Sequence, residues 1–200
     1  MVEKGSRAEK AERTKRALLE AAKRCIGLEG YTGASISKIS QAAGVSKSVV
    51  YYHFRSKEEI ATAVLEDAFG TIFSQCSNAI AGAKDAPAAL RDMLSAFADF
   101  LFGNKELSRF LLSELWRGER AWSEVMSAKT DVLTAMLEDQ VKRGVKEGVI
   151  RSDVDARFAA VSMLGIILAA SQYCLSRGEQ GGKEQFVAQV LGFVAPALER

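Results

Sequence analysis

Side chains that commonly carry catalysis or bind transition metals are scarce in this chain. A single histidine, His53, occurs in 200 residues, and the three cysteines have no C-x-x-C spacing. Zinc sites need several such ligands, and a catalytic triad needs a histidine beside a nucleophile and an acid. No Walker A loop or dinucleotide-binding glycine fingerprint occurs either. We therefore expect no cofactor, no metal and no enzyme activity; a reactive carboxylate pair in the C-terminal part is the alternative that stays open.

The cysteines and the first residues bear on location. Cys25, Cys76 and Cys174 are odd in number and far apart, which favours a reducing cytosol over a disulfide framework. Each is expected to be a small buried side chain, with redox sensing as the alternative. Residues 1–16 are charged and lack the apolar stretch of a signal peptide. The expected location is cytoplasmic.

Proline is rare too, since only Pro87 and Pro196 occur, and no run of alternating β-branched residues stands out. Apolar residues recur instead at helical spacing, and 48% of the chain is hydrophobic, which is enough for a core. We predict an all-α fold of about nine helices. It should comprise an N-terminal three-helix domain at residues 1–56 and a larger helical domain at residues 57–200.

One stretch has no charge at all. Residues 158–176 lie uncharged between Arg157 and Arg177, about the length of a transmembrane helix. The stretch also holds serines, a glutamine and several alanines. A helix that is apolar nearly all round also suits the centre of a soluble bundle or a subunit interface, and this interpretation, without a membrane, is the one we favour.

Charge is distributed unevenly along the chain. Residues 1–60 hold 12 Lys and Arg against 7 Asp and Glu, a net of +5, and residues 61–200 hold 15 against 18, a net of −3; together these give the overall +2. A basic N-terminal third fits a polyanionic partner such as DNA. For the cations before Lys38, plain solvation of the first helix is the alternative.

Residues 35–57 predict two short helices joined by a tight turn. Ser35 is a good N-cap for a helix over residues 36–43. Gly44 can take the positive φ that a sharp corner needs, and Ser46 is expected to cap a second helix. This is a helix-turn-helix, which places its second helix in the DNA major groove.

Four segments carry a family resemblance: LLEAA at 18–22, EGY at 29–31, ISQAAGVS at 39–46 and YYHFRSKEE at 51–59. In this order and spacing they resemble the TetR family of bacterial repressors, over roughly residues 12–64. The resemblance implies a dimeric transcription factor, with a helix-turn-helix DNA-binding domain at residues 1–56 and a helical, ligand-sensing effector-binding and dimerisation domain at residues 57–200. The chain departs from the family pattern in having isoleucine, serine and valine where phenylalanine, glycine and threonine are often found, at Ile26, Ser48 and Val49.

The resemblance also implies how the motif meets a double-stranded operator. Lys47 and Ser48 are expected to read bases and Val49 to pack on a thymine methyl, because these lie early on the second helix. The tyrosines, His53 and Lys57 are expected at phosphates, with packing between helices as the alternative for the tyrosines. The full predicted set is Ser35, Ser37, Lys38, Ser46, Lys47, Ser48, Val49, Tyr51, Tyr52, His53 and Lys57.

Large apolar side chains are frequent after residue 60. By the resemblance, the helices that carry them surround an effector cavity, which would suit a small, mostly apolar ligand; for each residue alone, plain core is the alternative. The candidates are Phe69, Phe73, Phe97, Phe100, Trp116, Trp122, Met126, Met163 and Tyr173. No cluster of buried cations indicates an anionic effector.

The last helix has an apolar face wider than one neighbour requires. Together with the preceding helix it is expected to form a four-helix interface between two copies of the chain; closing the core of a single chain is the alternative. The predicted homodimer contacts are Phe186, Val187, Val190, Leu191, Val194 and Leu198.

The leading hypothesis is a repressor that is released from an inverted-repeat operator by a small apolar effector. The alternative is a constitutive DNA-binding regulator without an effector. A third possibility is an enzyme or membrane-associated protein with a borrowed helix-turn-helix.

Overall fold

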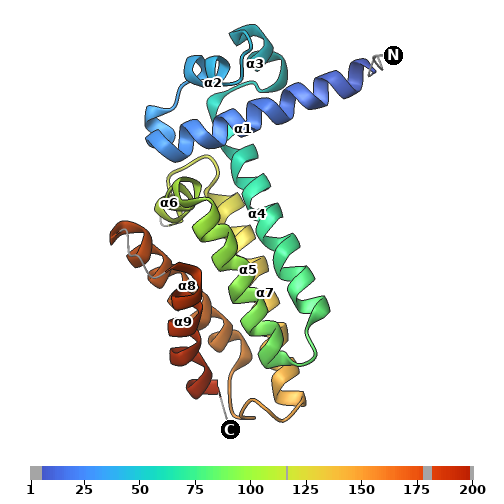
Figure 1. The fold of residues 1–200 in the computed structure, drawn as a ribbon, viewed down its shortest axis with the longest axis vertical. Helices are drawn as coiled ribbons and strands as arrows, with labels where there is room; N and C mark the ends of the chain where they lie inside the picture. Colours follow the sequence, from blue (N-terminus) through green and yellow to red (C-terminus); the bar gives the residue numbers. More distant parts are fainter. Residues whose placement is uncertain (1–5, 116, 178–181, 199–200) are drawn as a thin grey trace.

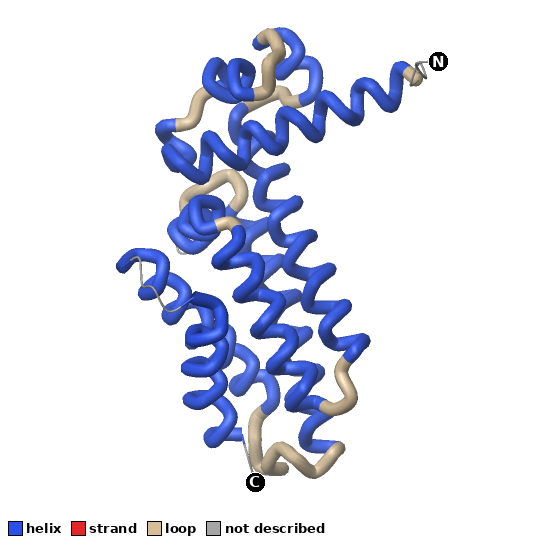
Figure 2. The backbone as a smooth tube through the Cα atoms, viewed as in Figure 1, coloured by secondary structure: helices blue, strands red, loops and turns tan. Residues whose placement is uncertain are grey.

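The predicted all-α architecture is confirmed. The computed structural model describes residues 6–115, 117–177 and 182–198, and within these ranges the chain forms nine α-helices and no strand (Figures 1 and 2). The helices are α1 (Arg7–Gly33), α2 (Ile36–Ala42), α3 (Lys47–His53), α4 (Lys57–Gly82), α5 (Ala86–Gly103), α6 (Lys105–Glu114), α7 (Ser123–Lys146), α8 (Ala156–Arg177) and α9 (Gly182–Leu198).

The molecule is elongated, with a small head at one end. Helices α1, α2 and α3 form the head, and α4 leaves it and runs along the body beside α5 (Figure 1). Helices α5, α7, α8 and α9 complete the body, with α7 packed on α8 and α9 packed on α5. Because α4 belongs to both parts, it is a rigid connection from the head to the far end of the body.

The head is built as the sequence predicts. The Ser35 hydroxyl accepts a hydrogen bond from the Lys38 backbone N–H at 3.2 Å, which caps α2, and Gly44 has a φ of 69° at the corner before α3. A second positive φ, 69° at Gly30, bends the end of α1 toward α2. Ile26, Ile39 and Val50 come from the three helices and are fully buried together.

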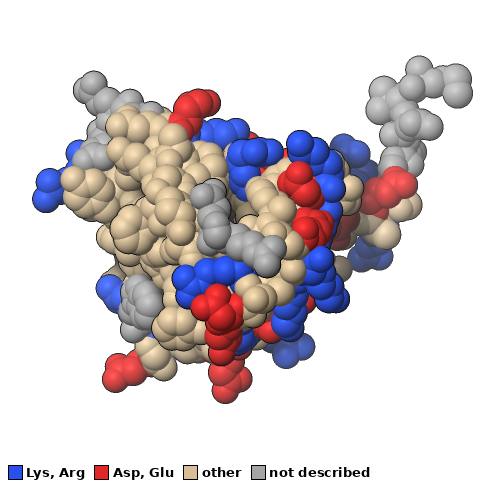
Figure 3. Space-filling model, turned by 90° about the horizontal axis from the view of Figure 1, so that it is seen from below, with Lys and Arg blue, Asp and Glu red and all other residues tan. Residues whose placement is uncertain are grey.

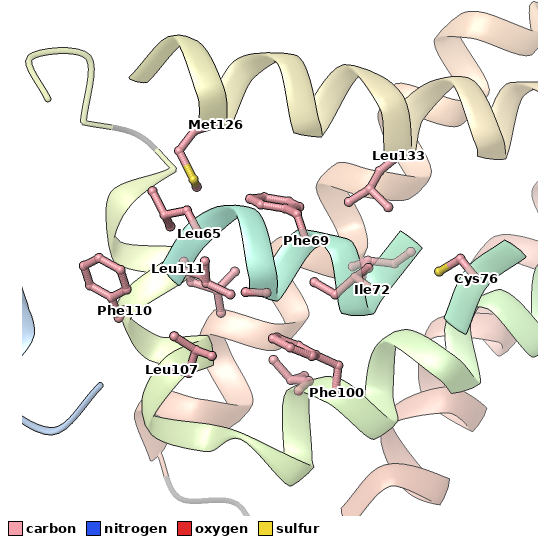
Figure 4. Packing of buried hydrophobic residues seen from close by; sticks show 14 of the residues in the cluster. Leu65, Phe69, Ile72, Cys76, Phe100, Leu107, Phe110, Leu111, Met126 and Leu133 are labelled. Atoms are coloured by element: carbon pink, nitrogen blue, oxygen red, sulfur yellow. The ribbon is translucent and has the colours of Figure 1, made fainter. Parts of the chain in front are cut away.

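The body is a continuous apolar core. Phe69 of α4, Phe100 of α5 and Met126 of α7 are each at most 5% exposed, and Figure 4 shows Met126 and Leu133 pointing from α7 toward α4. This packing between long helices fixes α4 against α5 and α7 of the body.

Helix α6 lies between the head and the body. It crosses α1 so closely at Gly27 that an added Cβ would stand 3.1 Å from Cβ of Glu106. From the same helix, the Arg109 guanidinium donates to the Leu175 carbonyl near the end of α8, at 3.2 and 3.1 Å. Thus α6 touches both a helix of the head and a helix of the distal body.

Helix α8 is, among the described residues, the one helix long and apolar enough to span a membrane. The Asp155 side chain caps the start of α8, because its carboxylate accepts a hydrogen bond from the Phe158 backbone N–H at 2.9 Å. Ala160, Leu164 and Ile167 face the core, where α8 packs on α6, α7 and α9. Length and composition alone are weak evidence for a span, because the buried helix of a bundle has the same properties.

Candidate nucleic-acid interface and effector cavity

Helix α3 presents its predicted DNA-reading side to solvent. Val50 and Phe54 are buried and fix the helix in the head, while Tyr51 and Tyr52 are 56% and 75% exposed. Lys47 is exposed and has no ion-pair or hydrogen-bond partner among the residues described. A free cation and two aromatic hydroxyls on one short helix can contact base edges and phosphates.

The start of α3 differs in detail from the prediction. Ser46 occupies the N-cap position, but its side chain makes no capping bond. Its hydroxyl instead pairs with the Ser48 hydroxyl at 2.8 Å, because residues two apart at the corner bring both hydroxyls to the same side. Both serines are exposed, and each keeps further hydrogen-bonding capacity for a nucleic acid.

The two other lysines in the predicted DNA-binding set are engaged within the head. The Lys57 ammonium donates to the carbonyls of Tyr31 and Ala34 at 3.0 and 3.1 Å and lies 4.1 Å from the Tyr31 ring centroid. The Lys38 ammonium pairs with Glu29 and donates to the Gly33 carbonyl. Both cations hold the bent end of α1, so the interpretation of Lys57 as a free phosphate ligand does not match its placement here.

The remaining predicted DNA-binding residues are less prominent. Ser37 is exposed on α2, whereas the Ser35 hydroxyl is used as a cap. Val49 is half-buried at the side of α3. His53 is also half-buried, and its ring stands edge-on to Tyr52 with centroids 5.0 Å apart. The structure therefore gathers the most accessible candidates on α3 itself.

A residue that the sequence interpretation missed, Tyr31, joins three segments. Its hydroxyl donates to the Glu58 carboxylate at 2.6 Å, and its ring meets Trp122 edge-on with centroids 4.6 Å apart. Burial and the bond to Glu58 raise the pKa of Tyr31 to about 12, and the same bond lowers the pKa of Glu58. Because its partners are distant in sequence, no local pattern could reveal this role.

The placement of Trp122 corrects its prediction as a cavity residue. Trp122 is 1% exposed and packs on Tyr31 at the joint between head and body, with the Arg120 guanidinium 5.7 Å from its ring. It lines neither apolar cavity found among the described residues. The loop before α7 carries the indole to the head rather than into the body. Trp116, also predicted there, lies outside the described residues.

An apolar cavity of about 130 Å³, called here the inner chamber, lies in the distal body. Helices α5, α7, α8 and α9 supply most of its walls. Of the predicted pocket residues, it contains Phe97 and Met163. Its other walls are aliphatic, and include Met93, Leu137 and Ile167. The walls favour an apolar occupant.

A smaller apolar cavity of about 40 Å³, the middle chamber, lies nearer the head. Of the predicted pocket residues, it contains Phe69, Phe97, Phe100 and Met126, together with Ser108 of α6. Sequence reasoning missed Ser108 because a serine within an amphipathic helix carries no signal of where its hydroxyl points.

Two further predicted pocket residues lie outside the walls of both chambers. The Phe73 ring lies beside the Phe69 ring with centroids 5.8 Å apart and meets Lys129, without lining either chamber. Tyr173 is 49% exposed, and the Arg177 guanidinium lies 4.9 Å from its ring. Phe73 is half-buried and Tyr173 is exposed, so neither belongs to the fully buried side of its helix, and composition alone could not fix this.

The predicted subunit contacts on α9 divide into two groups. Phe186, Val190, Val194 and Leu198 are at most 8% exposed, because this stripe packs on α5 and α8 of the same chain. These four are therefore core residues, contrary to the prediction. Val187 and Leu191 are half-buried and also pack on the core.

A different apolar face is left open. Phe158, Val161 and Tyr173 of α8 are 72%, 50% and 49% exposed, and Phe193 of α9 is 71% exposed. Figure 3 shows uncharged side chains covering the side on which α8 and α9 lie, whereas most charged side chains gather on the other side. Exposed large apolar residues grouped on two adjacent helices are typical of a surface for another protein.

The remaining candidates for redox or metal chemistry are the cysteines and the acidic side chains. The three cysteines form no disulfide. Burial raises the pKa of Cys76 to about 11, which disfavours the reactive thiolate. Within the described ranges, no group of three or more His, Cys, Asp or Glu side chains could hold a metal ion.

Comparisons with known proteins agree with this geometry. The sequence matches the family model "Bacterial regulatory proteins, tetR family" over residues 18–64 and the model "Tetracyclin repressor-like, C-terminal domain" over residues 87–178. The HTH-type transcriptional repressor NicS of Pseudomonas putida is 29% identical over 152 residues, which covers 75% of this chain and 72% of NicS.

Solved structures share the fold. The transcriptional regulator FadR from Bacillus subtilis, in complex with stearoyl-CoA, has a TM-score of 0.84 at 20% identity, covering 92% of this chain and 99% of FadR. AibR in complex with isovaleryl coenzyme A and operator DNA has a TM-score of 0.75 at 22% identity, covering 92% and 98%. At such identities the likeness concerns the fold alone.

Proposed function

This chain belongs to the tetR family of bacterial regulatory proteins, and on that premise we propose that it is a ligand-responsive transcriptional repressor. It binds an inverted-repeat operator as a homodimer and is released by a small effector with an apolar chain. The protein then works in the cytoplasm with the chromosome, and α8 is a bundle helix rather than a membrane span.

The observation that carries the DNA-binding proposal is the exposed side of α3. Lys47 has no competing partner among the residues described, so its ammonium is available for guanine O6 and N7. Ser48 and Val49 flank it for further base contacts, and Tyr51 and Tyr52 reach outward for phosphates. In this proposal Lys38 and Lys57 act indirectly, by holding the helices that position α3.

The homodimer is proposed to form through the open apolar face of α8 and α9. Gly165 and Ala169 are exposed on α8 between the larger side chains, and small residues let helices approach closely. Pairing this face about a twofold axis would cover Phe158 and Phe193 on both copies. It would also set two α3 helices to read half-sites about one helical turn apart, roughly 34–36 Å.

The effector is proposed to carry an apolar acyl chain. The support is the apolar walls of the inner and middle chambers, together with two structural neighbours seen with acyl thioesters, stearoyl-CoA and isovaleryl coenzyme A. The domain division belongs to the same proposal: residues 1–56 bind DNA and residues 57–200 bind the effector and the second copy. Helices α4 and α6 connect the two.

One observation favours the constitutive alternative. Cavities of about 130 and 40 Å³ are smaller than the roughly 300–1,000 Å³ usual for small-molecule sites. A ligand must therefore be slender or must widen the chambers on entry. A regulator without an effector would need no such change, and the two functions differ in whether any ligand alters operator affinity.

The test begins with selection of bound sequences from random duplex DNA, followed by sedimentation of the protein with and without the selected site. The proposal expects an inverted repeat bound by two copies, and weaker binding when an acyl-CoA is added. A monomer bound at full affinity to a single half-site would contradict the dimer. Operator affinity unmoved by any acyl-CoA that binds would favour the constitutive regulator.

A further inference from the structure

Three hollows lie in series through the body. A surface depression of about 470 Å³, called here the outer depression, shares Leu115, Met126, Thr130 and Leu168 with the middle chamber. The middle chamber in turn shares Phe97, Leu133 and Leu164 with the inner chamber. Each hollow therefore adjoins the next through shared wall side chains.

The walls of the three hollows change from polar in the outer depression to apolar in the two chambers. The outer depression includes Arg117, Ser123, Ser127 and Asp131, of which Arg117, Ser127 and Asp131 are exposed. The two chambers behind it are walled almost wholly by aliphatic and aromatic side chains. This gradient matches an amphiphile whose head stays at the surface and whose tail lies inside, because apolar groups gain by leaving water and a charged head does not.

One polar group in the middle chamber has no partner. Ser108 is 2% exposed, and its hydroxyl makes no hydrogen bond to the described residues. Neighbouring helical hydroxyls behave differently: Thr130 bonds back to the Met126 carbonyl at 2.8 Å, and Ser113 bonds back to Phe110 at 2.8 Å. A buried hydroxyl without a partner is costly, so its presence in a cavity wall points to a ligand oxygen.

We propose that the three hollows form one channel for a single-chain acyl amphiphile, with Ser108 as its polar anchor and Phe97 as its length gate. The head rests in the outer depression, the Ser108 hydroxyl donates to an oxygen of the acyl group, and the chain runs past Phe97 toward the inner chamber. This rests on the proposed effector function and specifies which ligands that site takes.

Phe97 is placed to act as the gate because it lines both chambers and is half-buried. Leu133 and Leu164 complete the partition. Short chains end before the ring, whereas long chains must pass it to gain the inner chamber. Widening the partition should therefore help long chains only, and closing it should exclude them.

The probes are straight-chain saturated acyl compounds from octanoate to stearate, each as the free acid and as the coenzyme A thioester, titrated calorimetrically. Phe97→Leu should tighten the longest chains by about tenfold relative to octanoyl, and Phe97→Trp should weaken them by a similar factor. Phe73→Leu is the matched control, because Phe73 lines neither chamber. The difference between acid and thioester tells which head the outer depression accepts.

Ser108→Ala should weaken every acyl compound by about fivefold while raising the unfolding temperature of the ligand-free protein. A purely structural role predicts no loss of affinity. Ser113→Ala on the same helix is the control, since its hydroxyl already has a carbonyl partner.

The outcomes separate this channel from the regulator itself. If acyl compounds bind and release operator DNA but the Phe97 variants shift all chain lengths equally, the length gate is wrong and the effector function stands. If the chain-length shift occurs but operator affinity does not change, the channel stands and effector-driven release is wrong. If none of the acyl compounds binds, both are overturned.

Discussion

The hydroxyl of Tyr31, at the end of α1, donates a 2.6 Å hydrogen bond to the carboxylate of Glu58, in the first turn of α4. The Tyr31 ring also contacts the Lys57 ammonium, which lies over it, and the Trp122 ring, which meets it edge-on. A single side chain thus links the DNA-binding head, the first turn of the connecting helix and the loop before α7. Loss of the Tyr31 hydroxyl should weaken the attachment of the head without disturbing the apolar core of the head or of the body.

Tyr31→Phe is expected to lower the free energy of unfolding by about 1 kcal/mol at neutral pH, because one hydrogen bond to a carboxylate is lost. The Glu58 pKa is lowered in the folded protein, so this contribution is present above the unfolded value and disappears as pH falls through the folded one. The Tyr31 pKa is raised from 10.0 to about 12, so its contribution is lost as pH rises across that interval.

Urea unfolding of the wild type and Tyr31→Phe, from about pH 3 to neutrality and from about pH 9 to 11, measures this dependence. The difference in free energy of unfolding between the two proteins should be largest at neutral pH and should decrease toward acid pH. A gap that stays constant with pH would show that Tyr31 acts only through packing.

Substitutions of Lys47 and Lys57 should cause two different defects, one in operator recognition and one in the stability of the head. Lys47→Ala is expected to cost roughly 1–3 kcal/mol on the selected operator and to relax preference at one base pair in each half-site. Folding stability should not change, since Lys47 is exposed and has no partner among the described residues. Operator variants at each position, measured by fluorescence anisotropy, locate the affected base pair.

Lys57→Met should instead destabilise the head by about 1.5–3 kcal/mol, because two part-buried carbonyls lose a charged donor. Bound DNA would be lost through unfolding of the head rather than through a phosphate contact. The slope of log affinity against log salt should therefore match that of the wild type under conditions where the variant is folded. A slope reduced by about one would restore Lys57 as a phosphate ligand.

The contrast between these lysines shows what the sequence could reveal. Ser35 and Gly44 were predicted correctly because a cap and a positive φ are local properties. The role of Lys57 depends on carbonyls of residues 31 and 34, which are distant in sequence and approach only after the end of α1 bends at Gly30.

The same reason explains the errors on α9 and around Trp122. The apolar stripe through Val190 and Val194 could equally face a second copy or its own core, and only the packing of α5 decides that it faces the core. Nothing in the local sequence decides whether the indole of Trp122 enters the cavity or packs on Tyr31 where the head meets the body. Composition and periodicity identify which residues are apolar but not which neighbour they meet.

Phe193→Asp and Val194→Asp test the revised subunit surface with adjacent residues. Phe193 is 71% exposed and Val194 is 8% exposed. Phe193→Asp should yield folded monomers with intact helicity and weak operator binding, because the charge is placed on the open face. Val194→Asp should destabilise the fold by about 3 kcal/mol or more, since an unpaired charge would be buried.

Sedimentation together with circular dichroism distinguishes these two effects. Phe158→Asp on α8 should behave as Phe193→Asp does, because both side chains lie on the same proposed interface. If Phe193→Asp remains a dimer at full operator affinity, the open face has another partner.

Gly27 tests whether α6 carries the signal between effector and head. Gly27→Ala adds a Cβ that would stand 3.1 Å from both Cβ of Glu106 and the backbone nitrogen of Leu107, so α6 must move away from α1. Release of operator by a hundredfold needs a coupling free energy of about 2.7 kcal/mol, and DNA must weaken the effector by the same factor. We expect Gly27→Ala to reduce the hundredfold factor at least fivefold. The effect of effector on operator affinity and the effect of operator on effector affinity should fall together.

Gly70→Ala on α4 is the matched control, because it gives the same gain in helix propensity where nothing lies within 4 Å of the added carbon. Operator affinity is titrated with and without palmitoyl-CoA, and palmitoyl-CoA affinity with and without operator. A ligand shifts DNA binding only through its different affinity for two states, so a loosened α6 should leave effector affinity in the absence of DNA nearly unchanged. Full coupling in Gly27→Ala would exclude the contact between α1 and α6 as the route and leave α4 as the connection.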